Sequence, residues 1–300
     1  MGPLLFLVYI NDLGHFFENF RPILFADDSN LITNGKNINE IEHKFKLEIT
    51  KLVKWLQTNR LSLNLTKTHY MIFGTNKKKF PSDLNLEIEG VIIDEVKETK
   101  FLGIILENTL SWNSHISHIS KKIAKSVGIL TRARQMLNKK ILTQLYYSFL
   151  YPYIMYCNVI WGNSPDKHLW QIFKLQKRAM RVIANIRRRD STQQAFNELR
   201  ILRLPELYIY SVLIFVFKFK NGLLPATFND FFTENREYHR YPTRGATNLR
   251  APRAKLKIAS TFVKTTGTNL WNRYTPTMAQ TNKIGPFKRE LISILICRYI

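Results

Sequence analysis

The spacing of apolar and polar positions in the first 60 residues predicts a helix, a β-hairpin and a second helix. Residues 4–17 are mostly apolar, which favours a helix packed under a sheet. Two strand-like runs then flank Asp27 and Asp28, and aspartate tolerates the positive φ of tight turns, so we expect a hairpin with this pair at its tip and at least one face buried. Over residues 38–56, apolar side chains recur every three or four positions, as in an amphipathic helix that Asn37 or Asn39 can cap.

Short strands are predicted between this helix and residue 106. Leucines alternate with polar residues over 61–65, and residues 69–73 predict another strand. An alternating run over 84–89, a turn at Gly90 and a returning run over 91–93 predict a hairpin. Residues 100–106 predict a further strand, in which Gly103 marks a bulge or a close approach of backbone.

From residue 112 onward the periodicity is helical. Apolar positions repeat at spacings of three and four over 116–130, 138–150 and 165–183. In the second of these helices, Asn138 is expected to cap the start, and Ile141 and Phe149 are among the side chains expected to be buried. A fourth apolar helix over 205–219 is predicted to end at Asn221-Gly222, because glycine favours the left-handed conformation after a helix.

Charge is the compositional feature that changes this picture. The 300 residues include 45 Lys and Arg against 22 Asp and Glu, which gives a net charge of +23 and a pI near 10.0. Such an excess predicts a polyanionic partner, with nucleic acid as the first candidate and a membrane surface as the alternative. The apolar runs are too short to span a bilayer, and no secretory signal is evident. Two cysteines form no disulfide framework, so an intracellular, non-secreted protein is expected.

Basic side chains gather on the predicted helix over residues 165–183. Its polar positions include Lys174, Lys177, Arg178 and Arg181. A helix face with one sign of charge suits contact with duplex phosphates regardless of sequence, and a solvated charged face is the alternative.

The region from residue 236 onward mixes basic and aromatic residues. Segment 239–244 is followed by Arg250 and Arg253. Aromatic rings interleaved with arginines suit stacking and backbone contact with single-stranded RNA. A loosely ordered tail lying on the preceding helices is the rival interpretation.

Asp27 and Asp28 carry the candidate chemistry. Adjacent carboxylates beside a buried hairpin repel each other and are costly to desolvate, and a divalent cation offsets both effects. Such an arrangement suits metal-dependent phosphoryl or nucleotidyl transfer, in which metal ions stabilise the attacking and leaving oxygens. From the dipeptide alone, a plain polar turn is the favoured alternative.

The neighbouring motifs favour the metal-dependent site over a plain polar turn, because they occur in a fixed order. They are Gly2-Pro3-Leu4-Leu5-Phe6, Tyr9-Ile10-Asn11-Asp12-Leu13, Phe25-Ala26-Asp27-Asp28, Trp55, the run N-R-L-S-L-N at 59–64, Lys67-Thr68 and Phe101-Leu102-Gly103. In this order and spacing the chain resembles the reverse transcriptase of non-LTR retrotransposons, in particular the jockey-like group. The Phe-Ala-Asp-Asp box alone is a moderate signal, whereas the ordered set is a strong one.

The resemblance implies an α+β fold in three parts. A partial polymerase palm, an antiparallel sheet with packing helices, would occupy residues 1–106. A mostly α-helical thumb would occupy 107–222, and a basic C-terminal region 223–300. The implied activity is RNA-templated DNA synthesis, in which a primer 3′ hydroxyl attacks the α-phosphate of a deoxynucleoside triphosphate. The implied partners are an RNA template, a DNA primer and these nucleotides, without a membrane, in a ribonucleoprotein of the cytoplasm and nucleus.

The resemblance also assigns site residues, motif by motif. Asp27 would be the main Mg²⁺ ligand and Asp28 the second, with Mn²⁺ as a substitute metal. Lys67 would contact the triphosphate or assist the departure of pyrophosphate. Gly2-Pro3 would lie near the template and the incoming nucleotide. Phe101-Leu102-Gly103 would belong to the hairpin that grips the primer end at the junction of palm and thumb.

One carboxylate of the family's two-metal site is expected outside these residues. In the family it lies on the first palm strand, before Gly2, and Asp12 belongs to the wrong motif to replace it. We therefore expect an N-terminally truncated palm whose own activity is doubtful. The alternative is a non-catalytic basic module that binds nucleic acid and derives from such a polymerase.

Overall fold

The computed structural model describes residues 1–74, 84–237, 245–253, 256–278 and 281–297, so the predicted aromatic and basic segment 239–244 lies outside the described residues. The chain forms two compact units. The first comprises Met1–Phe101 and Leu106–Leu110, and the second comprises Leu102–Ile105 and Ser111–Ile300. The first unit mixes helices and strands and the second is helical, so the mixed composition agrees with the predicted α+β class.

The first unit contains the following elements in chain order: α1 (Gly2–Ile10), η1 (Asn11–His15), β1 (Arg21–Phe25), β2 (Asp28–Ile32), α2 (Ile38–Thr58), β3 (His69–Tyr70), β4 (Glu87–Ile88), β5 (Val91–Ile92), β6 (Asp94–Glu95), β7 (Glu98–Phe101) and β8 (Ile104–Glu107), the last of which continues into this unit from the second. Among the described residues these strands form four two-stranded sheets, β1-β2, β3-β6, β4-β5 and β7-β8. The β3-β6 pair is parallel, so the prediction of one antiparallel sheet is wrong in detail.

Helix α2 confirms the predicted amphipathic helix. The Asn37 side chain accepts a hydrogen bond from the Glu40 N–H at 2.9 Å and so caps the first turn. The apolar stripe buries Ile49, Leu52 and Trp55 in the core of the first unit. The apolar spacing and the capping asparagine therefore both predicted this helix from the sequence.

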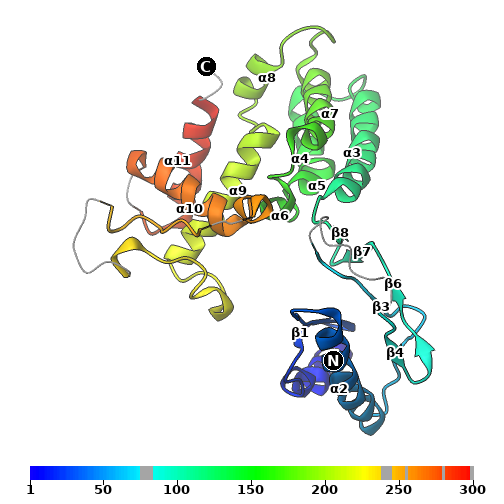
Figure 1. The fold of residues 1–300 in the computed structure, drawn as a ribbon. Helices are drawn as coiled ribbons and strands as arrows, with labels where there is room; N and C mark the ends of the chain where they lie inside the picture. The colour runs from blue at the N-terminus through cyan, green and yellow to red at the C-terminus, as the bar shows by residue number, and fades with distance from the viewer. Residues whose placement is uncertain (75–83, 238–244, 254–255, 279–280, 298–300) are drawn as a thin grey trace. The chain divides into compact units, whose positions relative to one another are not determined.

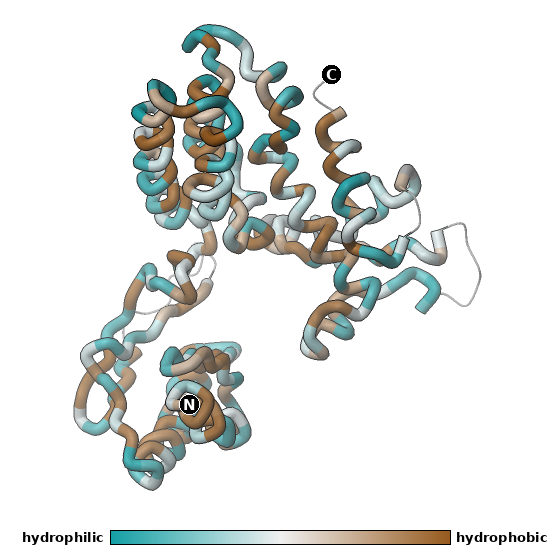
Figure 2. The backbone as a smooth tube through the Cα atoms, turned by 180° about the vertical axis from the view of Figure 1, so that it is seen from behind, coloured by the Kyte–Doolittle hydropathy of each residue, from teal (hydrophilic) through white to brown (hydrophobic). Residues whose placement is uncertain are grey.

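Helix α1 differs from its prediction. It ends at Ile10, and a 3₁₀ turn follows instead of helix to residue 17. Ile10 and Leu13 are buried, whereas Leu4, Leu5 and Val8 are exposed. The helix is apolar on all sides, as the brown tube at the N mark in Figure 2 shows, so its sequence gives no indication of which side packs.

Two of the predicted strands are also shorter or absent. Strand β3 covers His69–Tyr70 rather than 69–73. Over 61–65 the leucines are half-buried but no strand forms, because the chain turns at Asn64, whose carbonyl accepts hydrogen bonds from the Lys67 and Thr68 N–H groups at 3.1 Å.

The β4-β5 hairpin confirms the turn predicted at Gly90, where Glu89 and Gly90 both have positive φ.

The stretch 100–106 is two strands and not one. Leu102 (φ 44°) and Gly103 (φ 83°) form a two-residue turn between β7 and β8. Positive φ at both central positions is the geometry of the commonest tight hairpin turn. The apolar pattern predicted one strand with a bulge because leucine rarely adopts this conformation, whereas the resemblance of Phe101-Leu102-Gly103 to a hairpin of the family agrees with the turn.

The second unit is a helical array with these elements: α3 (Asn113–Ala133), α4 (Lys139–Phe149), α5 (Tyr151–Met155), α6 (Asn158–Trp161), α7 (Asp166–Ala184), α8 (Gln193–Glu198), α9 (Leu204–Lys220), η2 (Ala226–Phe228), η3 (Asn235–Glu237), η4 (Lys257–Thr261), α10 (Val263–Tyr274), η5 (Thr275–Thr277) and α11 (Ile284–Cys297). Helices α3, α4, α5 and α7 lie side by side (Figure 1), and α10 and α11 pack on α9. Within the described residues, none of the helices is both long and apolar enough to cross a bilayer.

The helical periodicities are largely confirmed. The predicted stripe of α3 is buried throughout, at Ile116, Ile119, Ile123, Val127 and Leu130. Asn138 caps α4 through a hydrogen bond from the Ile141 N–H at 3.0 Å.

Helix α4 buries fewer side chains than predicted. Leu142 and Tyr146 are buried, whereas Ile141 and Phe149 are exposed, which corrects their prediction as core residues. Only part of the apolar surface of this helix is therefore buried against its neighbours.

Helix α9 is apolar on nearly every side because it has two packing partners. Leu207, Leu213 and Phe217 belong to the main core of the second unit. Tyr208, Val212 and Val216 belong to a second cluster with Phe232 and Leu249 and with α10. The helix ends before Gly222, whose φ of 62° fits the predicted stop. The segment after residue 222 therefore packs directly against the bundle.

Candidate catalytic hairpin and nucleic-acid surface

Asp27 and Asp28 lie at the end of the β1-β2 hairpin, but the turn is displaced by one residue from the predicted Asp-Asp tip. Phe25 pairs with Asp28, so the two turn residues are Ala26 and Asp27, and Ala26 has the left-handed φ of 52°. Asp28 is the first residue of β2. Both carboxylates are exposed, and so is the Phe25 ring, so the desolvation expected from a buried hairpin is absent at this tip.

The base of this hairpin is tied to α2 by Glu48. Its carboxylate accepts hydrogen bonds from the Asn19 N–H at 3.2 Å, the Asn19 side-chain amide at 2.9 Å and the Glu18 N–H at 3.3 Å. The Thr33 hydroxyl donates to the Asn19 carbonyl at 3.0 Å, which holds the end of β2 to the same residue. Burial of Glu48 opposes its ionisation, but the hydrogen bonds from Asn19 and Glu18 and from Lys51 outweigh it and lower its pKa.

Glu48 was missed in the sequence, although a signal existed. It stands between Phe45 and Leu52 at the spacing of the apolar stripe of α2. A charged residue at a core position of an amphipathic helix predicts a buried partner, because an unpaired buried charge is costly. The anchor holds the base of the hairpin that carries Asp27 and Asp28.

Several residues of the ordered motifs hold the first unit together. The Trp55 indole N–H donates to the Asp12 carboxylate at 3.3 Å, and the Tyr9 hydroxyl donates to the Asn59 carbonyl. These contacts join the region of α1 and η1 to α2. Asp12 is therefore engaged with Trp55, in line with its placement outside the metal motif.

Lys67, Gly2 and Pro3 are exposed residues of the same unit. Lys67 lies in the turn that begins at Asn64, and its carbonyl lies 3.0 Å from His69 Nδ1. Gly2 and Pro3 form the first turn of α1, and the space around Gly2 is open to at least 4 Å. Their assigned roles therefore remain predictions.

The donor set of the hairpin suits Mg²⁺. Magnesium is commonly bound by one or two carboxylates together with substrate phosphates, and Asp27 and Asp28 supply two adjacent, exposed carboxylates. In the part of the chain that the structure describes, no group of three or more His, Cys, Asp or Glu side chains is placed to hold a metal ion. These residues therefore fit a site that is completed by substrate phosphates or by further ligands.

The turn at Leu102-Gly103 is fixed by aromatic side chains of the second unit. The Tyr156 hydroxyl donates to the Leu102 carbonyl at 2.5 Å, and the same ring lies 3.4 Å from the Cβ position of Gly103. The Trp161 indole N–H donates to the Tyr156 carbonyl at 2.9 Å. Phe101, the last residue of β7, is half-buried. Sequence reasoning found the turn residues but not Tyr156.

His115 holds the strand that follows this turn. Its Nδ1 accepts a hydrogen bond from the Ile105 N–H at 3.3 Å, and its ring packs edge-on against Trp161 at 5.8 Å between centroids. The side chain is 1% exposed. Burial, assisted by the positive charges of His118 and Lys122, lowers the pKa of His115 to about 4.

This shifted pKa predicts an acid-sensitive second unit. Unfolded His115 binds a proton below about pH 6.5 and the folded residue only near pH 4, so stability is full above pH 6.5 and falls toward pH 4. As the pH falls from 7 to 5, we expect the titration of His115 to lower the free energy of unfolding by about 2 kcal/mol. Urea denaturation of the wild type and of His115→Gln at the two pH values measures the difference.

Gln171→Ala, an exposed and non-titrating position on α7, is the control, and it should retain the wild-type pH dependence. Equal pH dependence in the wild type and in His115→Gln would contradict the assignment. Other acid-sensitive groups contribute to all three proteins and cancel in the comparison.

Helix α7 presents the predicted basic face. With about 100° between successive residues, Lys174, Lys177, Arg178 and Arg181 fall within an arc of about 100° on one side of the helix. Lys174 and Arg178 are exposed, and Arg187, Arg188 and Arg189 follow the helix, also exposed. The opposite side, which includes Ile172 and Met180, is buried against the bundle. The face is therefore a one-sided cationic surface.

Three of these cations have additional partners, and the first is Lys174, whose ammonium lies 5.8 Å from the centroid of Trp170. The Lys177 ammonium lies 4.2 Å from the centroid of Trp170 and 4.7 Å from that of Phe173, a cation–π arrangement. Burial and the charges of Arg181 and Lys174 lower the pKa of Lys177. Arg181 donates to the Asp190 carbonyl at 3.3 Å. Trp170, 46% exposed, adds a ring for stacking that sequence reasoning left out.

Comparison with curated proteins finds polymerases of insect mobile elements. The probable RNA-directed DNA polymerase from transposon BS of Drosophila melanogaster is 30% identical over 198 residues, which cover 62% of this chain and 21% of that protein. The probable RNA-directed DNA polymerase from transposon X-element of the same species is 24% identical over 192 residues, covering 61% and 21%. The RNA-directed DNA polymerase from mobile element jockey, also of this species, is 23% identical over 215 residues, covering 68% and 23%.

The chain spans only part of these relatives. The matched segments make up 21–23% of the length of these relatives. No family model matches the chain, and no solved structure does.

Proposed function

This chain is a relative of the RNA-directed DNA polymerases of jockey-like non-LTR retrotransposons, as its ordered motifs predicted, and from that premise we propose that it carries part of the machinery of RNA-templated DNA synthesis. The observation that carries the proposal is the Asp27-Asp28 pair, exposed at the tip of a hairpin whose base is anchored to α2. We assign the first 106 residues to a partial palm, residues 107–222 to a thumb, and 223–300 to a basic C-terminal region.

Asp27 and Asp28 hold Mg²⁺ in this proposal, and Mn²⁺ can replace it. When bound, the metal offsets the charge of the triphosphate and lowers the barrier to attack by the primer hydroxyl. Two exposed carboxylates, one in the hairpin turn and one at the first residue of β2, can reach a bound nucleotide without first being desolvated. Lys67, also exposed, assists by contact with the triphosphate.

Primer and template contacts are assigned to the remaining motif residues. Gly2 and Pro3 approach the template, and Phe101, Leu102 and Gly103 the primer end. The fixed backbone at Leu102, held by Tyr156, supports the second assignment, because a grip on the primer requires a turn that does not move. The basic face of α7 contacts duplex phosphates through Lys174, Lys177, Arg178 and Arg181.

Primer extension tests the proposal. The whole chain is incubated with a DNA primer annealed to an RNA template, deoxynucleoside triphosphates and Mg²⁺. Catalysis by this chain would appear as extension that stops when EDTA removes the metal. Absence of extension over a range of Mg²⁺ and Mn²⁺ concentrations would contradict catalysis by this chain.

A second function, binding of nucleic acid without catalysis, is favoured by the basic face of α7, which does not depend on the hairpin. It predicts retained affinity for the primer–template that falls steeply with salt. It also predicts that Asp27 is irrelevant to that affinity. Binding without extension would establish this second function in place of the first.

A further inference from the structure

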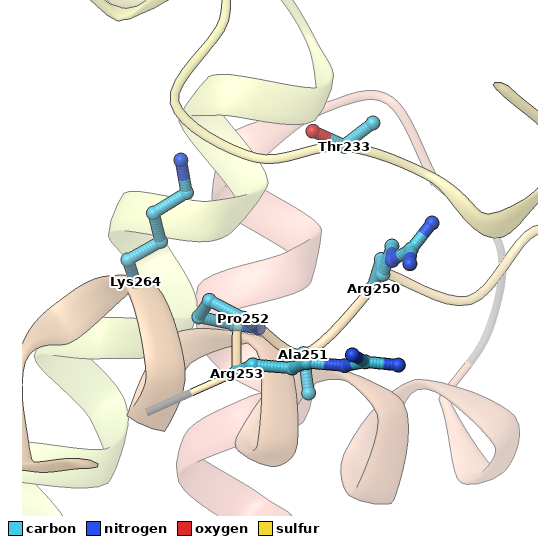
Figure 3. Close-up of a pocket in the computed structure, with 6 residues that line it drawn as sticks. All are labelled: Thr233, Arg250, Ala251, Pro252, Arg253 and Lys264. Atoms are coloured by element: carbon cyan, nitrogen blue, oxygen red, sulfur yellow. The ribbon is translucent and has the colours of Figure 1, made fainter. Parts of the chain in front are cut away.

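A cationic hollow lies in the C-terminal region, and none of its lining residues was assigned a contact in the proposed function. It has a volume of about 260 Å³ and is lined by Thr233, Arg250, Ala251, Pro252, Arg253 and Lys264. Figure 3 shows the Thr233, Arg250, Arg253 and Lys264 side chains spread around it, from three separate segments of the chain. Three of the six lining residues are cationic, and none is acidic.

The backbone around the hollow is held in place. The Arg250 N–H donates to the Thr233 carbonyl at 2.8 Å, which joins two of the lining segments. Asn272 of α10 clamps the preceding residue, Leu249, by accepting from its N–H at 2.9 Å and donating to its carbonyl at 2.8 Å. Leu249 itself is buried in the cluster shared with α9. The positions from which Arg250 and Lys264 project are therefore fixed by the fold.

The nearest acidic residue in sequence is engaged elsewhere. Glu234 follows Thr233, but its carboxylate pairs with the Lys220 ammonium and with Arg236 Nε at 2.6 Å. Lys264, for its part, lies over the Phe231 ring at 5.7 Å from its centroid. Glu234 is thus paired with two cations that do not line the hollow.

We propose that this hollow binds a phosphate group. Guanidinium groups match the oxygens of phosphate through paired N–H donors, and a lysine adds a point charge. Lys264 is the second residue of α10, so the positive end of that helix dipole reinforces the same preference. The hydroxyl of Thr233 offers a further donor. The phosphate comes either from a polynucleotide backbone or from a free phosphate compound such as pyrophosphate.

The test removes two lining charges from the whole chain. Arg253→Gln/Lys264→Gln is compared with Arg273→Gln/Arg289→Gln, which removes two charges from α10 and α11 outside the hollow. All four side chains are exposed, so both variants should fold, and equal melting temperatures would verify this. Binding of a fluorescein-labelled 12-nucleotide RNA is measured by anisotropy against salt concentration. Binding of inorganic pyrophosphate is measured by calorimetry.

Polynucleotide binding predicts that the first variant binds RNA about 10-fold more weakly than the second at low salt. The slope of log affinity against log salt should also fall by about 0.7, the value for one phosphate of a single strand. A free phosphate compound as ligand predicts instead that RNA affinity is equal in the two variants, while pyrophosphate binding is lost in the first alone. If both variants lost equal affinity for RNA and for pyrophosphate, the effect would depend only on the net charge of the chain, and the proposal would be overturned.

Discussion

In a full-length version of the polymerase, replacing Asp27 by asparagine is expected to abolish primer extension on an RNA template, with a loss of at least about 100-fold in rate. Asparagine keeps the size of the side chain and its tolerance of turn geometry but removes the charge that holds the metal. A divalent ion supplies several kcal/mol of transition-state stabilisation, and each 1.4 kcal/mol corresponds to about a factor of ten. Because Asp27 is exposed in a two-residue turn, the change should leave stability nearly unaltered.

Asp94→Asn supplies the matched control. Asp94 is an exposed aspartate of β6 in the same compact unit and belongs to none of the ordered motifs. It should extend primers at the wild-type rate. Extension by Asp27→Asn at that same rate would overturn the metal assignment. Affinity of both variants for the primer–template, measured in EDTA, should match the wild type, which separates loss of chemistry from loss of binding.

Gln176→Ala is expected to destabilise the second unit by about 3–5 kcal/mol. Gln176 is fully buried in α7 and donates to the Tyr146 hydroxyl at 3.0 Å and to the Leu202 carbonyl at 2.9 Å. Its own carbonyl accepts from the Leu204 N–H at 2.9 Å. Truncation leaves three buried polar groups without this partner and opens a cavity between α4, α7 and the start of α9.

Urea unfolding followed by circular dichroism measures this effect. Gln171→Ala, an exposed position on the same helix, is the control and should change the free energy of unfolding by less than about 0.5 kcal/mol. Similar small changes for both variants would contradict the buried network. Because Gln176 fixes α7, its loss should also weaken binding of nucleic acid by the basic face.

The sequence by itself determined the elements whose signals are local. The stripe of α3, the Asn37 and Asn138 caps and the stop at Gly222 follow from side-chain spacing and backbone preference within a few residues, and each is confirmed. The ordered motifs also led to the correct relatives. Asp27 and Asp28 were placed on a hairpin correctly, to within one residue of the turn.

The tertiary structure decided everything that depends on a distant partner. Leu102 adopts a left-handed φ in a turn whose carbonyl is bonded by Tyr156, 54 residues away, and no local preference predicts that. Which side of α1 is buried depends on what packs there, because its own pattern is apolar all round. The cationic hollow brings Thr233, Arg250 and Lys264 together from three segments.

Glu48 and Gln176 stand between these two cases. Each occupies an apolar-stripe position of an amphipathic helix, so the sequence shows that a polar group is buried there. It does not show which partners satisfy that group, because hydrogen bonds across the fold connect residues whose separation in sequence is arbitrary. Local spacing sets the helices and turns, whereas the contacts that fix the Asp27-Asp28 hairpin and the basic face of α7 exist only once the chain has folded.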